Sequence, residues 1–150
     1  MPSLFTIGYE QAKPAAVMHE LKHAKIDLVV DTRAVAASRR PGFSKRQLAA
    51  ALAAEGIGYV HLQKLGTPAE GRQAARAGDY DRLWKIYDKQ IQKPETQEAL
   101  GELLALIKSK KRIALLCYCR DPKFCHRSRI VANVKKRMPV MVTDLIPAPF

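Results

Sequence analysis

Short apolar segments alternate with segments of helical periodicity along the whole chain. The segment "LFTIG" (4–8) predicts a first strand. A helix is expected from Pro14 to Ala24, because proline suits a first turn and Val17 and Leu21 share one face. The run "IDLVVD" (26–31) is almost continuously apolar and rich in β-branched residues, which is the pattern of a strand buried on both faces.

The alternation continues to the end of the chain. Ser44 is placed to cap a helix that ends at Glu55, and "IGYVHL" (57–62) predicts a third strand. Further helices are expected at 80–91, after Pro94 and at 126–137, with strands at 112–118 and 140–146. Strands that alternate with helices predict an α/β fold: a single three-layer domain (1–150) with a mostly parallel sheet of about five strands flanked by helices.

One connection is longer than the others. Residues 63–79 ("QKLGTPAEGRQAARAGD") are rich in glycine, proline and charge and carry no clear apolar pattern. Long connections without regular structure are uncommon in small domains unless they serve a function. We therefore expect a functional loop or a lid here.

Composition limits the partners. The chain carries 26 Lys plus Arg against 14 Asp plus Glu, a formal net charge of +12, which favours polyanions and above all nucleic acid. A basic surface without a specific partner is the plain alternative. No apolar run approaches the roughly 18 to 20 residues of a membrane span, no secretory signal is evident, and three cysteines do not suit a disulfide framework. We expect a soluble cytoplasmic protein without membrane contacts.

The fold directs attention to one edge of the sheet. In parallel sheets, ligands gather beyond the carboxyl ends of the strands. The residues that follow the predicted strands are polar or reactive, so one crevice should collect them: Gly8, Tyr9, Glu10, Asp31, Arg33, His61 and the segment 117–127.

The segment 117–127 ("CYCRDPKFCHR") holds all three cysteines of the chain. Cys125 falls at the start of a predicted helix, where backbone N–H groups and nearby arginines should lower its pKa and favour a reactive thiolate. His126 could move a proton near neutral pH, and Asp31 could orient it. Cys125, His126 and Asp31 are therefore the candidate catalytic residues.

Phosphate binding is expected beside them. An arginine fork at a helix N-terminus suits phosphate, which nominates Arg127 together with the strand-end residue Arg33. A basic loop, "SRRPGFSKR" (38–46), is a second candidate for phosphate contacts, with a solvated loop as its alternative. The candidate substrate-binding residues are Gly8, Tyr9, Arg33, Ser38, Arg39 and Arg127.

Three other interpretations of the cysteine segment stay open. Cys117, Cys119, Cys125 and His126 are the ligand types of a zinc site, but their spacing is irregular and adjacent residues on a helix do not easily face one ion. A disulfide between Cys119 and Cys125 is conceivable through the turn, although it would be labile in a reducing compartment. Cys117 could also be a plain buried strand residue. We therefore predict neither a metal nor another cofactor.

The motifs also carry a resemblance. "FTIGYE", "VVDTR", "SRRPGFSK", "GIGYVHLQKLGTP", "GDY" and "LLCYCRDPKFCHRS" resemble, in order and spacing, the uncharacterised family called domain of unknown function 488. The resemblance implies a compact α/β domain and no established reaction. The positions that recur in the family correspond to Gly8, Asp31, Arg33, Ser38, Phe43, Gly56, Tyr59, Leu65, Gly66, Cys117, Asp121, Pro122, Cys125, His126 and Arg127. Where the family usually has a glutamate, this chain has Cys119, so a carboxylate role does not carry over.

Two functional hypotheses follow. The first is a protein that acts on, or binds beside, a phosphate-bearing substrate, nucleic acid first among them, in a crevice lined by Asp31, Arg33, Cys125, His126 and Arg127. The second is a non-catalytic nucleic-acid-binding or interaction module in which the same polar residues only stabilise the turn.

Overall fold

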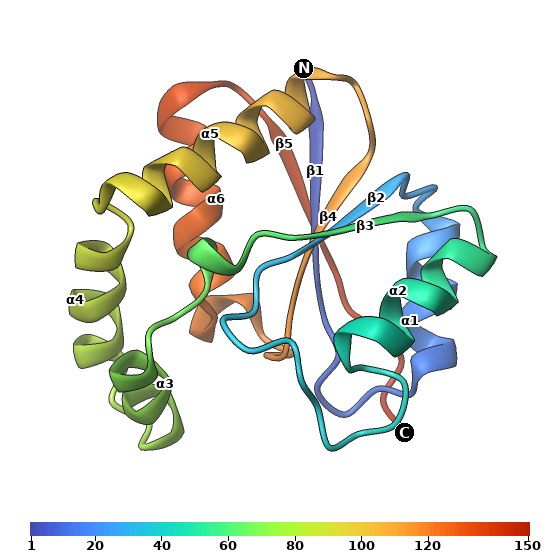
Figure 1. The fold of residues 1–150 in the computed structure, drawn as a ribbon, viewed down its shortest axis with the longest axis horizontal. Coiled ribbons are helices and arrows are strands. Elements are labelled where there is room, and N and C mark those ends of the chain that lie inside the picture. Colours follow the sequence, from blue (N-terminus) through green and yellow to red (C-terminus); the bar gives the residue numbers. More distant parts are fainter.

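A five-stranded, all-parallel sheet forms the centre of the molecule (Figure 1). The computed structural model describes residues 1–150. The strands are β1 (Ser3–Gly8), β2 (Leu28–Asp31), β3 (Gly58–His61), β4 (Ile113–Cys117) and β5 (Met141–Leu145), in the spatial order β3-β2-β4-β1-β5. The predicted α/β class is confirmed, and the sheet is wholly rather than mostly parallel.

Helices cover both faces of the sheet, so the molecule has three layers (Figure 1). One face carries α1 (Pro14–His23) and α2 (Lys45–Ala54), and the other carries α4 (Tyr80–Gln90), α5 (Pro94–Lys108) and α6 (His126–Arg137). Each face has its own hydrophobic cluster. Val17, Leu21, Leu48 and Leu52 pack under the first pair of helices, and the stripe of α5 packs on the other face with Tyr87 and Ile130.

The connection after β3 contains a helix that the sequence pattern did not predict. A short 3₁₀ turn (Gln63–Leu65) is followed by α3 (Ala69–Arg76), which packs against α4. Only Gly71 and Ala74 of this helix are buried, so it lacks the large apolar residues that reveal helical periodicity. The connection was expected to be a functional loop or a lid; it contains regular structure and lies beside the carboxyl edge of the sheet, and its function stays a prediction.

Register brings the strand ends together at one edge. Gly8 lies opposite Cys117 in the pairing of β1 with β4, and Asp31 lies opposite Leu116 in the pairing of β2 with β4. The residues after these three strands therefore face a common space. At the same edge, α6 begins directly after a 3₁₀ turn (Pro122–Phe124).

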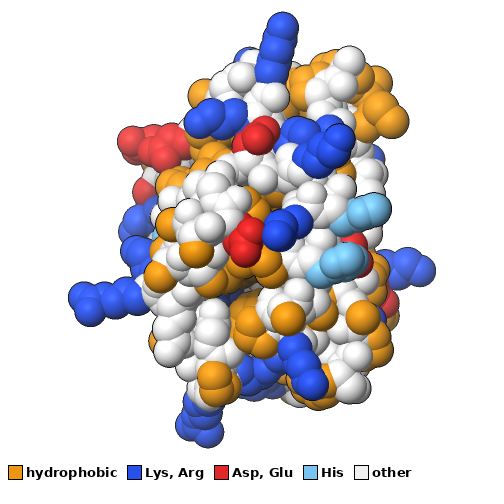
Figure 2. Space-filling view, turned by 90° about the vertical axis from the view of Figure 1, so that its right-hand side faces the viewer, with side chains coloured by type: hydrophobic (Ala, Val, Ile, Leu, Met, Phe, Trp, Pro, Cys, Tyr) orange, Lys and Arg blue, Asp and Glu red, His pale blue; other side chains and the backbone are white.

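Charge is spread over the surface rather than confined to this edge. On the face that Figure 2 presents, Lys and Arg side chains project at several places and outnumber the acidic ones. No helix is both long enough and apolar enough to cross a membrane.

Candidate functional site

A cavity of about 280 Å³ opens at the carboxyl edge of the sheet. Its walls come from the residues after β1, β2 and β4, from α3 and from the turn before α6. No acidic side chain lines it. The lining residues are Tyr9, Arg33, Ala34, Val35, Thr67, Arg72, Ala75, Arg76, Leu83, Cys117, Tyr118, Cys119, Phe124 and His126. The edge of the sheet at which the sequence placed the site therefore does hold a cavity.

Asp31 and Arg33 form a buried ion pair beside this cavity. Arg33 Nε donates to Asp31 Oδ1 at 2.9 Å, and Nη2 donates to Oδ2 at 2.7 Å. The remaining nitrogen, Nη1, donates to Tyr9 Oη at 3.1 Å and to the Phe43 carbonyl at 2.7 Å. Tyr59 Oη adds a hydrogen bond of 2.5 Å to Asp31 Oδ2. Every nitrogen of the guanidinium is thus engaged within the protein.

The pKa shifts agree with a structural role for the Asp31–Arg33 ion pair. Burial works against the charged guanidinium of Arg33, but the hydrogen bonds and the charge of Asp31 outweigh it and raise the arginine pKa. Burial and then the hydrogen bond to Asp31 raise the pKa of Tyr59. Asp31 is fully buried and does not line the cavity. Its position suits the orientation of Arg33 better than contact with a substrate.

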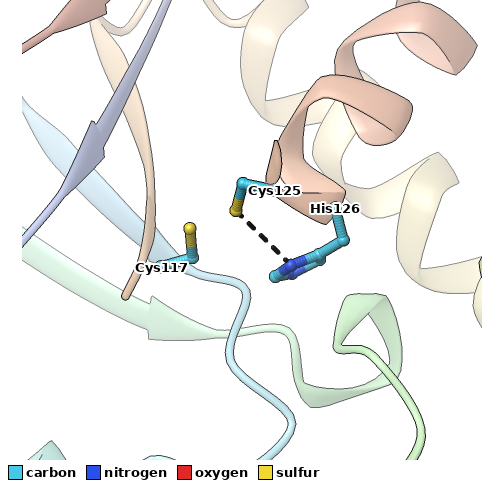
Figure 3. Close-up of side chains that lie close together, drawn as sticks. All are labelled: Cys117, Cys125 and His126. Carbon is cyan, nitrogen blue, oxygen red and sulfur yellow. Dashed lines mark hydrogen bonds between the residues drawn. The ribbon is translucent and has the colours of Figure 1, made fainter. Parts of the chain in front are cut away.

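Cys117, Cys125 and His126 form a second group, which we call the sulfur–imidazole cluster (Figure 3). Their Sγ and ring nitrogen atoms all lie within 4.8 Å of one another. Cys125 Sγ is 3.7 Å from His126 Nδ1, and the other ring nitrogen, Nε2, lies 3.0 Å from the Thr32 carbonyl oxygen. The carbonyl comes from the segment after β2, so the histidine links the start of α6 to this strand end.

Local backbone conformation explains how two adjacent residues reach the same point. Cys125 is the N-cap residue of α6 and has an extended conformation (φ −122°, ψ 143°), whereas His126 is the first helical residue. The side chains therefore leave the backbone from different conformations and converge. The sequence-based objection to a shared ligand point for Cys125 and His126 assumed that both were helical, and this assumption is wrong.

The prediction of a low pKa for Cys125 is also wrong. Burial raises the pKa of this thiol well above its ordinary value, and its thiol neighbours Cys117 and Cys119 raise it further. Cys125 is 1% exposed and does not line the cavity. Desolvation thus outweighs the helix N-terminus and the neighbouring arginines. Burial likewise raises the pKa of Cys117 to about 12.

The half-buried thiol that does line the cavity is Cys119. Hydrogen bonds from the thiols of Cys117 and Cys125 are the main reason that its pKa falls to about 3, and His126 and Arg127 contribute through their charge. His126 itself has a lowered pKa because burial disfavours the imidazolium. The structure therefore moves the accessible thiol from position 125 to position 119.

Arg127 is fully buried and makes no ion pair. Its Nη1 donates to Cys117 Sγ at 3.5 Å and Nη2 donates to the Arg120 carbonyl at 3.1 Å, while Nε has no hydrogen-bond partner. The guanidinium lies so close to Gly8 that a Cβ there would stand 2.6 Å from Nη1 and 1.8 Å from the Cys119 carbonyl oxygen. Arg127 does not line the cavity, so it is not placed as the expected phosphate fork.

The other predicted binding residues divide in the same way. Tyr9 lines the cavity, whereas Gly8, Ser38 and Arg39 do not. Ser38 Oγ accepts a hydrogen bond from the Arg40 backbone, and Arg39 is exposed. The basic loop thus lies outside the cavity, and its assignment as a phosphate-contacting loop stays a prediction.

Four lining residues bear on function although the sequence analysis did not name them as binding residues. Arg72 and Arg76 come from α3, the helix without large apolar residues, and Tyr118 and Phe124 flank the cysteines in the segment 117–127. Both aromatic side chains are about half exposed, at 50% and 47%. Their position in the segment that follows a parallel strand was the available signal, because ligands gather there and aromatic residues often carry binding energy.

Comparison with known proteins gives a family and no function. No curated protein shows a significant match to the chain. The family described as Domain of unknown function DUF488 matches residues 13–134, which include β2, β3, β4 and all but the last turn of α6. The match covers far more than half of the 150 residues and includes the whole sulfur–imidazole cluster. The chain therefore belongs to the family Domain of unknown function DUF488.

Proposed function

We propose that this protein binds a phosphate-bearing substrate, nucleic acid first among them, in the cavity at the carboxyl edge of the sheet and acts on it there. The observation that carries the proposal is the character of the cavity lining: arginines and aromatic side chains are present, and carboxylates are absent. Such a lining favours a ligand with both negative charge and a flat apolar part, which is the chemistry of a nucleotide.

The positive side of the cavity is the α3 wall. Arg76 is exposed and its guanidinium makes no hydrogen bond or ion pair with the protein, so it is free for a phosphate. Arg72 Nη1 donates to the Thr67 carbonyl oxygen at 2.8 Å, which leaves the other N–H groups of this guanidinium for a ligand. Arginine is well suited to phosphate because its planar fork offers two parallel donors. The net charge of +12 adds a long-range attraction for polyanions.

The apolar side of the cavity is aromatic. Tyr118 packs edge-on against Tyr9, with ring centroids 5.4 Å apart, and Phe124 packs on Tyr80 at 4.8 Å. These contacts hold the two half-exposed rings in place at the cavity. Stacking of one base on an aromatic side chain is worth about 1–3 kcal/mol and tolerates any base. A single unstacked base therefore fits the lining better than an intact duplex does.

Reactive groups lie at the floor. Cys117, Cys119 and His126 line the same cavity as the arginines. In this proposal Cys119 and His126 face the substrate, whereas Cys125 and Asp31 act through them, Cys125 beside the imidazole and Asp31 through Arg33. The earlier assignment of Cys125, His126 and Asp31 as catalytic thus remains a hypothesis with altered roles.

The non-catalytic alternative has one observation in its favour. Asp31, which the sequence nominated as catalytic, and Arg33, which it nominated as substrate-binding, make their hydrogen bonds inside the protein. A nucleic-acid-binding module would use the arginine and aromatic walls of the cavity without chemistry at its floor.

Binding is tested with fluorescein-labelled single-stranded RNA and DNA and with the matching duplexes, titrated across a salt series. We expect the single strands to bind more tightly, with affinity that falls as salt rises. Arg76→Ala should weaken binding by about 5- to 10-fold, as expected for a lost phosphate contact of roughly 1 kcal/mol. Arg82→Ala, a matched exposed arginine on the neighbouring α4 that does not line the cavity, is the control. Equal effects of the two changes, or affinity independent of salt, would contradict the proposal.

Turnover separates the enzyme from the module. The labelled strands and mononucleotides are incubated with the protein, and the products are analysed by mass spectrometry. Cys119→Ser should leave affinity within a few fold and abolish any mass change that the wild-type protein causes. If the wild-type protein binds the strands and changes none of them, the module is the better description.

A further inference from the structure

Two observations make the sulfur–imidazole cluster more than a set of buried residues. The first is distance. Zinc bonds of about 2.3 Å to sulfur and about 2.0–2.1 Å to nitrogen, at tetrahedral angles, separate neighbouring ligand atoms by roughly 3.5 to 3.8 Å. Cys125 Sγ and His126 Nδ1 are 3.7 Å apart, and Cys117 Sγ lies within 4.8 Å of both. Small side-chain movements would bring all three atoms to one ion.

The second observation is the tautomer of His126. The Thr32 carbonyl can only accept a hydrogen bond, so the ring nitrogen 3.0 Å from it, Nε2, must carry the proton. In the neutral ring, Nδ1 then presents its lone pair, and this nitrogen is the one that faces Cys125 Sγ. A histidine that binds a metal almost always donates its other N–H to a carbonyl or a carboxylate in this manner.

We propose that Cys117, Cys125 and His126 bind a zinc ion at the floor of the cavity, with the fourth position directed at the side of Cys119. Thiolate and imidazole ligands in a compact arrangement select zinc among the common divalent ions. The ligands come from the end of β4 and from the first turn of α6, which the sheet and the helix hold in fixed positions. The inference goes beyond the proposed function, because it concerns an ion and needs no phosphate-bearing ligand.

The charges around the cluster are compatible with a metal–thiolate centre. Arg127 is fully buried, makes no ion pair and directs Nη1 at Cys117 Sγ. Two thiolates cancel the charge of Zn²⁺, and a third thiolate from Cys119 would leave one negative charge beside the guanidinium. A metal centre with three thiolates would therefore give Arg127 the counter-charge that no carboxylate of the protein provides.

A hydrogen bond from the Cys125 thiol to Nδ1 would account for that pair alone. It would not explain why a second thiol stands within 4.8 Å of both atoms, or why a guanidinium donates to that second sulfur. A zinc ion accounts for the three donors together, and a Cys119 thiolate in the fourth position would account for the arginine as well.

Cobalt(II) is the probe, because tetrahedral Co²⁺–thiolate centres absorb strongly in the visible and near-ultraviolet. The reduced full-length protein is titrated with Co²⁺ and then with Zn²⁺. We expect saturation at one Co²⁺ per chain with thiolate charge-transfer and tetrahedral ligand-field bands, and displacement of cobalt by zinc. Absence of a charge-transfer band in the folded wild-type protein would overturn the proposal, and that measurement needs no variant.

Variants locate the ion. Cys125→Ala and His126→Asn should each lower the affinity more than about 100-fold, since loss of even an outer hydrogen-bonding partner typically costs 10- to 100-fold. The matched control is the double variant His19→Gln, His23→Gln, which removes the exposed pair on α1 whose ring centroids are 6.2 Å apart. The control should bind cobalt as the wild-type protein does. Loss of cobalt binding in the control, with retention in the cluster variants, would assign the ion to the surface and refute the proposal.

The zinc site and the phosphate-bearing substrate are tested by independent experiments, so either proposal can fail without the other. The cobalt and zinc titrations contain no nucleic acid, and the strand-binding experiment is repeated with and without a chelator. If a cluster variant does not fold, the melting temperature of the wild-type protein is measured instead. Zinc should raise this temperature, and a chelator should reverse the rise. An unchanged melting temperature at saturating zinc would count against the site.

Discussion

The Asp31–Arg33 ion pair and the sulfur–imidazole cluster lie at the same edge of the sheet and differ in one respect. In the ion pair, opposite charges meet and every guanidinium nitrogen has an oxygen partner. In the cluster, two buried thiols and an imidazole face one another beside Arg127, which makes no ion pair with a carboxylate and has an unpaired Nε. A buried charge is stable when it is paired and hydrogen-bonded. The first group is thus complete within the protein, and the second is suited to an additional partner.

The largest effect is expected when the ion pair is broken. Arg33→Met should destabilise the protein by about 3–5 kcal/mol, because it leaves the fully buried carboxylate of Asp31 without its counter-charge. The free energy of unfolding in urea measures this loss. Arg46→Met, a change at an exposed position of α2, should stay within about 0.5 kcal/mol of wild type. A stable Arg33→Met protein would mean that Asp31 does not depend on Arg33, and would reopen a direct role in chemistry.

Close packing around Arg127 predicts the next effect. Gly8→Ala should cost about 3 kcal/mol, at the upper end of the usual range for overpacking, because the new Cβ would meet the Cys119 carbonyl oxygen at 1.8 Å and Arg127 Nη1 at 2.6 Å. Gly101→Ala is the matched control inside α5, where nothing lies within 4 Å of the added methyl group. That change should stabilise the protein by about 0.5–1 kcal/mol. Equal stabilities of the two variants would show that the turn has room to move.

A smaller loss of stability is expected when Tyr59, which donates a hydrogen bond to Asp31, is changed. Tyr59→Phe removes the hydrogen bond from Oη to Asp31 Oδ2 and should cost about 1.5–3 kcal/mol, the range for a bond to a charged group. Urea unfolding is again the measurement, with Tyr80→Phe on α4 as a control whose hydroxyl makes no hydrogen bond. A loss below about 0.5 kcal/mol would indicate that Arg33 alone satisfies the carboxylate.

The smallest effect on stability should come from replacement of Arg127, which lies beside the sulfur–imidazole cluster. In the metal-free protein, Arg127→Met is expected to cost less than about 1 kcal/mol, because removal of a buried charge that has no carboxylate partner offsets the lost hydrogen bonds to Cys117 Sγ and the Arg120 carbonyl. Comparison with Arg33→Met in the same urea series is the decisive measurement. If both changes cost 3–5 kcal/mol, Arg127 has an anionic partner in the metal-free protein, and the contrast between the two regions disappears.

Most of the fold could be predicted from local patterns. The helix at 126–137 agrees with α6 residue for residue, and the strands differ from prediction by one or two residues at their ends. The exception is α3, whose sequence "AEGRQAAR" contains no large apolar residue. Its stability comes from packing against α4, which is a tertiary contact that periodicity does not record.

The edge of the sheet that holds the cavity could be predicted as well, because the carboxyl ends of parallel strands meet at one edge. Which residues at that edge are accessible from the cavity could not be predicted. Cys125 and Asp31 stand at the positions that the rule nominated, yet both are sealed from the cavity, whereas Cys119 opens to it. The pKa of Cys125 illustrates the reason: proximity to a helix N-terminus is local, and desolvation depends on everything packed around the thiol.

The sequence by itself determined the order of strands and helices, the parallel sheet, the edge at which polar and reactive residues gather, and the family. Only the tertiary structure decided which of these residues are hydrogen-bonded or ion-paired within the protein and which thiol faces solvent. It also decided that Cys125 and His126 converge on Cys117. The physical reason is that periodicity and strand ends are properties of short segments. Pairing, burial and convergence depend on distances between atoms that are many residues apart in the chain.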